Sequence, residues 1–431
     1  MESNIELNEE NTLNIIITGC IHGSMDKMYK DIQDYEKEHK KKIDLILCTG
    51  DFECMRNEYD LKFLSCPEKY REMGNFHEYY NSKKIAPYLT IFIGGNHEAS
   101  NYLEENYYGG YVAENIYYLG RAGVINVKGL RIGGISGIFN KFDYFKGHFE
   151  KVENDIKGDK KSIFHLREFE IAKMSHMKNK IDIFMTHDWP TNLVNEKDYN
   201  NVFKIKPHFK NQIKEGTLGS FPGEFILKHL KPHYYICGHM HFFYTNKIND
   251  TEIYAFDKCL KKRHYFDLIE VKQSINSIDK ENNDIYIDPE WMAITNSFNN
   301  YFPFEHKYYS FLNLFEENSK LLYQELVLNK MQFKTNYDII INVENNDNNE
   351  EVEIEKIIND LLINKFNKRE KIKYELNNQT ELMLSLLDIT KENNKHCLSS
   401  LYLKKKKIID DNKEINKKNN IKNTDEIEFQ I

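Results

Sequence analysis

The strongest constraint on the fold of this chain is a repeated unit: a short apolar run ends in glycine and is followed by a polar residue able to bind metal. The clearest copy is residues 88–93 (YLTIFI), followed by residues 94–98 (GGNHE). A buried strand that ends in two glycines can turn sharply, so Asn96, His97 and Glu98 come together at one strand end. This stretch therefore predicts a functional site and not a core segment.

Four other apolar runs are followed by polar residues of this kind, three of them after a glycine and residues 181–185 after Thr186. With the polar groups behind them, they are residues 13–18 with Cys20 and His22, 43–48 with Asp51, 181–185 with His187, and 232–237 with His239 and His241. A polar, periodic stretch over residues 26–40 predicts a helix between the first two runs. Such alternation is typical of an α/β chain, in which ligands gather at the carboxyl ends of the strands. We therefore expect all of these side chains to face one site.

The next segments complete this part of the chain. Residues 124–135 predict a hairpin that turns at Lys128 and Gly129, and residues 252–256 and 265–271 predict strands that close the sheet. Residues 137–161 interleave Phe and Tyr with Lys and show neither a strand nor a helix period. We interpret them as a long functional loop.

The composition changes after residue 271, where Asn, Ser and Asp become frequent. Residues 285–295 and the amphipathic stretch 308–328 predict a small helical addition. The expected division is a main domain over residues 12–272, a C-terminal segment over 273–341, and a low-complexity linker with a partly disordered tail over 342–431.

Charge and cysteine content argue against several protein classes. The net charge of -8 and the pI near 6.1 disfavour nucleic-acid binding through a generally basic surface, although they leave a local basic groove open. The seven cysteines are scattered and contain no CxxC pair, which disfavours a disulfide framework or a zinc knuckle and indicates a reducing compartment. No secretory leader and no stretch of about 18 uncharged residues is apparent. We expect neither secretion nor membrane insertion.

Histidine and carboxylate at several strand ends point to a metal site. One histidine beside a strand is more often a hydrogen-bonded surface residue than a ligand, but five gathered together are not explained in this way. Imidazole and carboxylate oxygen suit Zn, Fe and Mn, and a dinuclear site needs a carboxylate that bridges two ions. Asp51, directly after a strand-ending glycine, is the best candidate for the bridge.

The ordered motifs GCIH (residues 19–22), GDFE (50–53), GGNHE (94–98), THD (186–188) and GHMH (238–241) resemble those of the calcineurin-like metallophosphoesterases. Within that superfamily the sequence is most similar to the lariat debranching enzymes, because Cys20 replaces the usual first aspartate. Further similar stretches are residues 109–120, 134–139, 186–190, 257–260 and 288–295. The resemblance implies an α/β fold with a two-sheet β-sandwich flanked by helices and a small C-terminal helical addition. The main domain would then be the catalytic domain, and residues 273–341 a debranching-type segment.

The resemblance also implies two sets of metal ligands. One set is His22, Asp51 and His241, with Cys20 near or on the metal, and the other is Asp51, Asn96, His187 and His239. A sulfur ligand favours Fe(2+) or Zn(2+) over Mg(2+), and Mn(2+) is expected to support activity. Cys20 has a simpler interpretation as a small buried residue that ends a strand.

The implied reaction is hydrolysis of the 2′–5′ phosphodiester at the branch point of excised intron lariat RNA, which linearises the RNA for turnover. A metal-bound hydroxide would be the nucleophile, Asp51 and Asn96 would hold the metals, and His97 would protonate the departing 2′-oxygen as the general acid. Glu98 would either orient His97 or be a surface carboxylate without a role.

The 137–161 loop resembles the recognition loop of the same family, in which aromatic rings and lysines hold RNA. The residues expected to bind the substrate are Gly110, Tyr111, Ser136, Phe139, Lys141, Tyr144, Lys146 and His148. The alternative for the loop is an ordinary lid whose aromatics pack on the domain and whose lysines are solvated. The expected partner is branched intron lariat RNA, with neither DNA nor membrane, and the substrate implies a nuclear location, with some protein in the cytoplasm.

Two other functions use the same residues. A metallophosphatase acting on phosphoprotein or nucleotide would need the same ligands but no aromatic and basic loop. A non-catalytic scaffold on this fold would have lost ligands, whereas every ligand position here, apart from the variation at Cys20, holds a competent residue.

Overall fold

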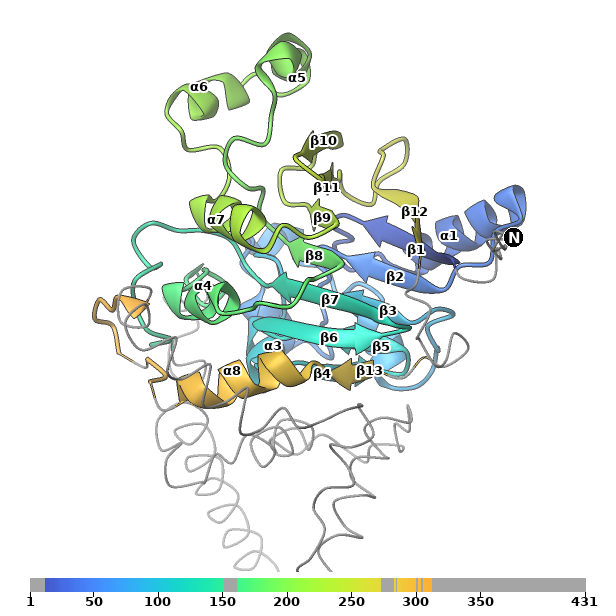
Figure 1. The fold of residues 1–431 in the computed structure, drawn as a ribbon. Coiled ribbons are helices and arrows are strands. Elements are labelled where there is room, and N and C mark those ends of the chain that lie inside the picture. The colour runs from blue at the N-terminus through green and yellow to red at the C-terminus, as the bar shows by residue number, and fades with distance from the viewer. Residues whose placement is uncertain are drawn as a thin grey trace, which may run out of the picture.

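Two β-sheets lie face to face with helices on both outer faces (Figure 1). The structure is a computed structural model, and it describes residues 12–150, 161–272, 283, 285–299, 301–303 and 305–311. The expected two-sheet sandwich flanked by helices is confirmed.

The first sheet has six strands in the order β12-β1-β2-β3-β5-β4. Their bounds are β12 (Phe266–Lys272), β1 (Thr12–Thr18), β2 (Leu45–Cys48), β3 (Thr90–Phe92), β5 (Ile116–Tyr118) and β4 (Gly110–Ala113). The four central strands run parallel, and the two edge strands run antiparallel to their neighbours. The carboxyl ends of β1, β2 and β3 therefore meet at one edge.

The second sheet has seven strands in the order β10-β11-β9-β8-β7-β6-β13. Their bounds are β10 (Tyr244–Ile248), β11 (Thr251–Ala255), β9 (Tyr234–Cys237), β8 (Ile183–Thr186), β7 (Leu130–Ile135), β6 (Ala122–Val127) and β13 (Ile285–Ile287). Strands β7, β8, β9 and β11 are parallel, so β8 and β9 also deliver their carboxyl ends together.

The sequence alternation explains how the layers form. In β1, Ile15 and Ile17 point into the apolar layer between the sheets, whereas Ile16 points to the outer face covered by helices. The helices are α1 (Met25–His39), α2 (Phe76–Tyr80), α3 (Ser100–Glu105), α4 (Glu168–Ser175), α5 (Tyr199–Ile205), α6 (Phe209–Lys214), α7 (Phe221–Leu230) and α8 (Pro289–Asn299). Helices α1, α2 and α3 contribute to the apolar cluster outside the first sheet, and α4, α7 and α8 to the cluster outside the second.

The hairpin at Lys128 and Gly129 is confirmed as the turn between β6 and β7, with φ of 49° and 75° at these two residues. The helical addition needs a correction, because residues 285–287 form β13, which pairs antiparallel with β6, and the helix begins only at Pro289. Residues 285–287 (IYI) alternate in the direction of their side chains, as in a strand, and they pair with the edge strand β6 before the helix begins. Strands β4, β5 and β10 were not predicted.

All of the chain after Phe311 lies outside the described residues, as do residues 151–160 of the predicted loop. The predictions for residues 312–328, for the linker at 342–349 and for the tail therefore fall on residues that the structure does not describe. Among the described helices, none is long and apolar enough to span a membrane.

Candidate metal centre

The carboxyl ends of β1, β2, β3, β8 and β9 meet, and glycine makes this approach possible. Gly50 has a φ of 106°, and a Cβ on it would lie 2.6 Å from Nδ1 of His187. A Cβ on Gly95 would lie 2.2 Å from Oδ1 of Asp51. Side chains at these two positions would therefore push the ligand-bearing turns apart, which explains why the apolar runs end in glycine.

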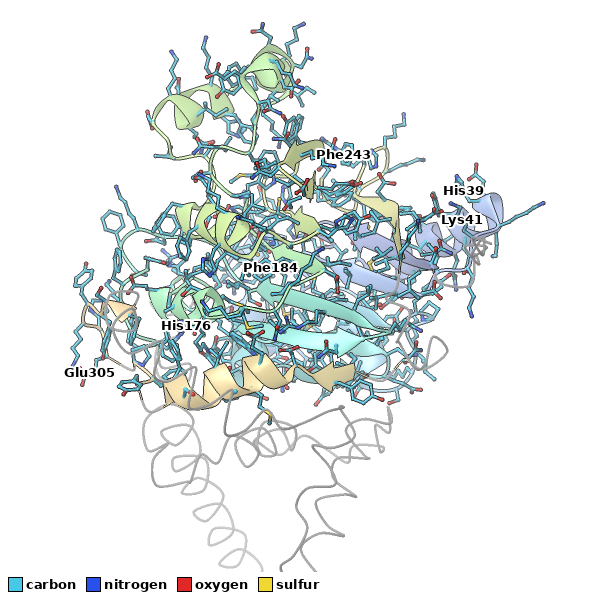
Figure 2. All side chains as sticks on the ribbon, viewed as in Figure 1. His39, Lys41, His176, Phe184, Phe243 and Glu305 are labelled. Carbon is cyan, nitrogen blue, oxygen red and sulfur yellow. The ribbon has the colours of Figure 1, made fainter. Side chains whose placement is uncertain are left out.

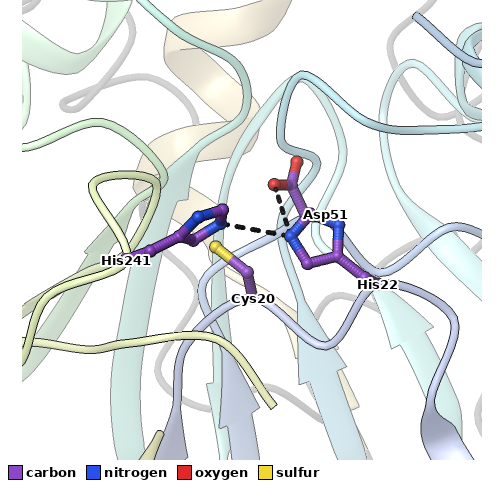
Figure 3. Close-up of side chains that lie close together, drawn as sticks. All are labelled: Cys20, His22, Asp51 and His241. Carbon is purple, nitrogen blue, oxygen red and sulfur yellow. Dashed lines mark hydrogen bonds and ion pairs between the residues drawn. The ribbon is translucent and has the colours of Figure 1, made fainter. Parts of the chain in front are cut away.

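Cys20, His22, Asp51 and His241 form one cluster, in which one potential ligand atom from each residue lies within 4.8 Å of the others (Figure 3). The Nε2 atoms of His22 and His241 are 3.1 Å apart, and Nε2 of His22 is 3.6 Å from Oδ2 of Asp51. Cys20 is fully buried, and its sulfur accepts a hydrogen bond from the His239 backbone N–H at 3.3 Å. The structure thus brings together the first predicted ligand set, including Cys20.

This cluster fits a cation. Nδ1 of His22 faces Oε1 of Glu53 at 3.0 Å and donates to it, so the His22 Nε2 lone pair faces the His241 ring. Oδ2 of Asp51 is buried and receives no hydrogen bond. Burial and the charge of Asp51 raise the pKa of the Cys20 thiol, so ionisation of this sulfur requires a nearby positive charge.

The second predicted ligand set lies on the other oxygen of Asp51. Nε2 of His187 is 3.3 Å from Oδ1 of Asp51 and 3.2 Å from Oδ1 of Asn96. Nδ1 of His187 donates to the Thr49 carbonyl at 2.6 Å, which leaves its Nε2 lone pair for the site. The ring of His239 lies 5.1 Å from that of His187, between centroids. The two oxygens of Asp51 therefore face two different groups of donors, as a bridging carboxylate must.

Charge compensation within the site acts on Asp51 itself. Burial raises the pKa of Asp51, but the charges of His187, His22 and His97 lower it by more. The pKa of Asp51 therefore lies well below its usual range. Asp51 is therefore an ionised carboxylate at neutral pH.

His97 lies beside the cluster and is not part of it. Its backbone N–H donates to Oδ1 of Asp51 at 2.8 Å, and its ring centroid is 5.5 Å from that of His22. Burial lowers the pKa of the half-buried ring, against the opposing effect of Asp51. This placement leaves the His97 side chain free to act on a bound molecule.

Glu98 has neither of the roles considered from the sequence. It is 1% exposed, so it is not a surface carboxylate, and it binds backbone groups instead of the His97 ring. Oε1 accepts from the N–H groups of Phe52 and Gly95 at 2.8 and 3.0 Å, and Oε2 accepts from Glu53 N–H at 2.8 Å. Glu98 therefore ties the turn that carries Asp51 to the turn that carries Asn96.

Glu53 is a second functional residue whose role the sequence did not reveal. It follows Asp51 by two residues with a φ of 59°, which turns its carboxylate back toward His22. Its place in the GDFE motif was the available signal, but the contact depends on two strands that are distant in sequence. Glu53 fixes the tautomer and orientation of a metal-ligand candidate.

The three predicted substrate-binding residues that precede the loop are buried in the domain. Gly110 and Tyr111 lie in β4, and the Tyr111 ring packs edge to face on Tyr117. Ser136 Oγ accepts from Gly94 N–H at 2.8 Å and donates to the Gly120 carbonyl at 2.6 Å. Ser136 thereby supports the turn that leads into GGNHE, and a contact of these residues with RNA stays a prediction.

The predicted loop exposes some of its aromatic and basic side chains and buries others. Lys141 is exposed, and its ammonium lies 5.0 Å from the ring centre of Phe142, which is 64% exposed. Tyr144 is 1% exposed and belongs to the core, while the half-buried Phe139 ring stacks edge to face on it. The outer tip of the loop is therefore available for contacts with another molecule.

The other two loop residues make internal contacts. Lys146 Nζ lies 2.9 Å from Oδ1 of Asp143 and 3.0 Å from Nε2 of His306, and His148 Nε2 lies 3.0 Å from Oε1 of Glu170. The backbone N–H groups of Gly147 and His148 donate to carbonyls at Glu305 and Pro303, at 3.1 and 2.8 Å. Residues 303–306 of the C-terminal segment therefore hold residues 146–148 of the loop in place.

Comparison with known families gives two matches along the chain. Residues 13–243 match the family model "Calcineurin-like phosphoesterase", and residues 249–392 match "Lariat debranching enzyme, C-terminal domain". The matches describe neither the boundary at 272/273 nor that at 341/342, which stay predictions.

Three similar proteins are named lariat debranching enzymes. The chain is 43% identical over 305 residues to the lariat debranching enzyme of Arabidopsis thaliana, a match that covers 69% of this chain and 71% of the relative. It is 41% identical to lariat debranching enzyme A of Xenopus laevis, over 65% of this chain and 54% of the relative. It is also 41% identical to the human lariat debranching enzyme, over 65% of this chain and 53% of the relative. The chain thus spans about half the length of these two vertebrate relatives.

Proposed function

The chain belongs to the lariat debranching enzyme family of calcineurin-like phosphoesterases, and we propose that it hydrolyses the 2′–5′ phosphodiester bond at the branch point of intron lariat RNA. The observation that carries this proposal is the cluster of Cys20, His22, Asp51 and His241 at the strand ends of a chain that matches both family models. As a member of this family the chain is a hydrolase that uses divalent metal.

We infer a dinuclear site in which Cys20, His22, Asp51 and His241 hold one metal, and Asp51, Asn96, His187 and His239 the other. When bound, such metals supply a water of lowered pKa and neutralise charge on the phosphoryl oxygens. The sulfur of Cys20 and the imidazole rings favour Fe(2+) or Zn(2+), and Mn(2+) is expected to support activity. Support comes from the two donor groups that face the two oxygens of Asp51.

His97 is the general acid in this proposal. Hydrolysis leaves negative charge on the departing 2′-oxygen, and a ring N–H of His97 can neutralise this charge by donating its proton. The backbone bond from His97 N–H to Asp51 fixes the ring beside the cluster. Among the residues that the structure describes, no carboxylate bonds to this ring and holds its proton back. Asp51, by contrast, acts only through the metals and by positioning His97.

The substrate is held by the exposed tip of the 137–161 loop. Phe142 and Phe145, which are 64% and 38% exposed, offer rings on which bases can stack, and Lys141 offers a cation to phosphate. A phosphatase for a small phosphoester would have no use for these features. RNA at a branch point is unpaired and flexible enough to reach such a tip.

The proposal is tested by offering purified protein with Fe(2+), Zn(2+) or Mn(2+) three substrates in parallel: a branched RNA with one 2′–5′ bond, a linear 3′–5′ RNA of the same sequence, and a phosphopeptide. We expect cleavage of the branched RNA alone. Asp51→Asn, which removes the bridging charge, should abolish it, while Glu270→Gln on the surface serves as the matched control. Cleavage of the phosphopeptide alone would contradict the proposal.

The substrate implies a nuclear location, with some protein in the cytoplasm, which imaging of the tagged full chain would test. If the tagged protein were absent from the nucleus of cells that still degrade intron lariats, this part of the proposal would be contradicted.

A further inference from the structure

The connection between β11 and β12 is strongly basic in an otherwise acidic chain. Residues 257–264 read DKCLKKRH, so four of eight side chains are lysine or arginine and only one is a carboxylate, although the net charge of the chain is -8. Lys261, Lys262 and Arg263 are exposed, and Lys258 is half-buried. A local concentration of positive charge of this kind attracts a polyanion.

This connection lies directly against the metal centre. The backbone N–H of Cys259 donates to the carbonyl of Cys20 at 2.8 Å, and the N–H of Asp257 donates to the His264 carbonyl at 3.2 Å. The first bond attaches Lys258 to the strand end that carries Cys20 and His22. The second closes the connection on itself, so the cations of residues 258–263 are held at the rim of the site.

Lys258 lies close to the ligand-bearing turn. The residue that follows it, Cys259, is bonded through its backbone to Cys20, which is one of the four residues of the ligand cluster. In the part of the chain that the structure describes, no side chain forms a hydrogen bond or ion pair with the Lys258 ammonium. This cation is therefore available to a ligand beside the metal centre.

Two further cations belong to this group. Nη1 of Arg263 lies 3.1 Å from Oδ2 of Asp257, which orients the guanidinium while half of the side chain stays exposed. Lys206, which caps α5, comes from a different part of the chain. Burial lowers the pKa of Lys206, Asp257 raises it, and Arg263 and Lys258 lower it, so the charges of all three residues act on the Lys206 ammonium.

Figure 2 labels one neighbour of the basic connection and one neighbour of the loop, and the two lie on different sides of the molecule. Phe243, whose ring stacks on His264 at 3.6 Å between centroids, lies near β10 and β11 on the side of the α5 and α6 projection (Figure 2). Glu305, which accepts a hydrogen bond from Gly147 of the loop, lies at the opposite lower side of the molecule. A strand of RNA that crosses the metal centre from the loop would reach the cations next.

We propose that Lys206, Lys258, Lys261, Lys262 and Arg263 form a basic rim that binds backbone phosphates of the RNA next to the bond to be cleaved. The proposal rests on the proposed function, because it names a second contact for the same substrate. The loop then supplies stacking on one side of the metal centre, and the basic rim supplies charge on the other. The phosphates, and not the bases, are the ligand, so the basic rim adds affinity without sequence preference.

The test compares two triple variants of the full chain. The first neutralises the basic rim with Lys206→Gln, Lys258→Gln and Arg263→Gln. The control is Lys37→Gln, Lys40→Gln and Lys42→Gln, which removes the same charge from exposed lysines at the end of α1 and the start of the β2 segment. This end of the first sheet is opposite to the carboxyl ends that carry the metal centre.

The measurement is the Kd of a fluorescent branched RNA whose 2′–5′ phosphodiester is replaced by a linkage that cannot be hydrolysed. Anisotropy titrations run from about 50 to about 200 mM KCl, the range over which phosphate contacts show as a slope of log Kd against log salt. Each phosphate contact to single-stranded RNA contributes about 0.7 to this slope, so the basic-rim variant should lose about 2. The fourfold rise in salt then weakens wild-type binding about 20-fold more than binding by the variant.

A basic-rim variant with the same slope and Kd as the control variant would overturn the proposal, because the lysines would then be merely solvated. A loss of slope in both variants would overturn it as well, since the effect would come from total charge. Metal content and thermal unfolding of both variants show that the fold is kept. The proposed function is tested separately, by wild-type cleavage of hydrolysable branched RNA, so a failure there leaves the binding result interpretable.

Discussion

Glu98 is the residue whose replacement should disturb this site most without touching a ligand. Its carboxylate accepts three backbone N–H groups, from Phe52, Glu53 and Gly95, and so fastens the Asp51 turn to the Asn96 turn. In Glu98→Gln the side chain keeps its shape but presents one acceptor and one NH₂ group. Two of the backbone donors can share the remaining oxygen, and the third faces another donor.

The cost of this change follows from the contacts. A hydrogen bond to a charged group contributes about 1.5–3 kcal/mol, and a buried N–H left without a partner costs about 1–3 kcal/mol. We therefore expect Glu98→Gln to lower the free energy of unfolding by about 3 kcal/mol or more, which corresponds to a fall in Tm of about 6 °C or more in a domain of this size. Metal affinity should fall too, because the two ligand turns are no longer fixed together.

The assay is thermal and urea unfolding with metal content measured on the same samples. Burial and the charge of Asp51 raise the pKa of Glu98 to about 8, so the comparison is made at about pH 8.5, where the carboxylate is ionised. Glu270→Gln, which removes only an exposed ion pair with Lys41, is the control and should change stability by less than about 1 kcal/mol. Equal stability and full metal content in Glu98→Gln would refute the positioning role.

Three further results are expected. His97→Ala should keep its metal and lose about 10²–10⁴-fold in turnover, and a loss of metal instead would contradict the general-acid assignment. Chelation removes the cation that the ligand cluster requires, so it should lower the free energy of unfolding by about 2.7 kcal/mol where metal had been at 100 times its Kd. The Tm should fall reversibly with it, and an unchanged Tm would contradict the metal site. Burial raises the pKa of Glu170, but His148, Lys173 and Arg121 lower it more, so this carboxylate stabilises the fold above its ordinary pKa of 4.5 and the contribution is lost as the pH falls below that value. Urea unfolding between about pH 6 and about pH 3 should therefore show a smaller pH dependence for Glu170→Gln than for wild type, and equal dependence would contradict this assignment.

The ligand positions could be predicted because each depends on a short local pattern. A buried run that stops at Gly50 or Gly95 fixes both the strand end and the polar residue behind it, and parallel strands bring such ends to one edge. The two-sheet arrangement came from the resemblance of the ordered motifs to a family, because periodicity alone does not say how strands divide between sheets.

The roles of Glu53 and Glu98 could not be predicted because they depend on tertiary contacts. From the sequence, a carboxylate two residues after a metal ligand is expected to be a surface group. Only the packing of β1, β2 and β3 against one another shows that Glu53 contacts His22 and that Glu98 accepts three backbone N–H groups. The same reason applies to Tyr144, which was expected to bind RNA and lies in the core at 1% exposure. Its RNA contact stays a prediction that burial does not favour.

The short segments were missed for a different reason. Strands β4, β5 and β13 have four, three and three residues, too few to show a period of two against the surrounding sequence. Residues 285–287 precede a true helix, so the helical pattern of α8 was extended over them. Their pairing with β6 depends on a free sheet edge that the sequence does not display.

The central claim is that this site breaks the bond between phosphorus and the branch 2′-oxygen by attack of water. The most direct measurement is hydrolysis of a branched RNA in ¹⁸O-labelled water, with mass spectrometry of both products. The account predicts one ¹⁸O atom in the 5′-phosphate of the released strand and none in the branch nucleotide, which regains its 2′-hydroxyl. Label in the 2′-hydroxyl, or cleavage at a 3′–5′ bond, would contradict it.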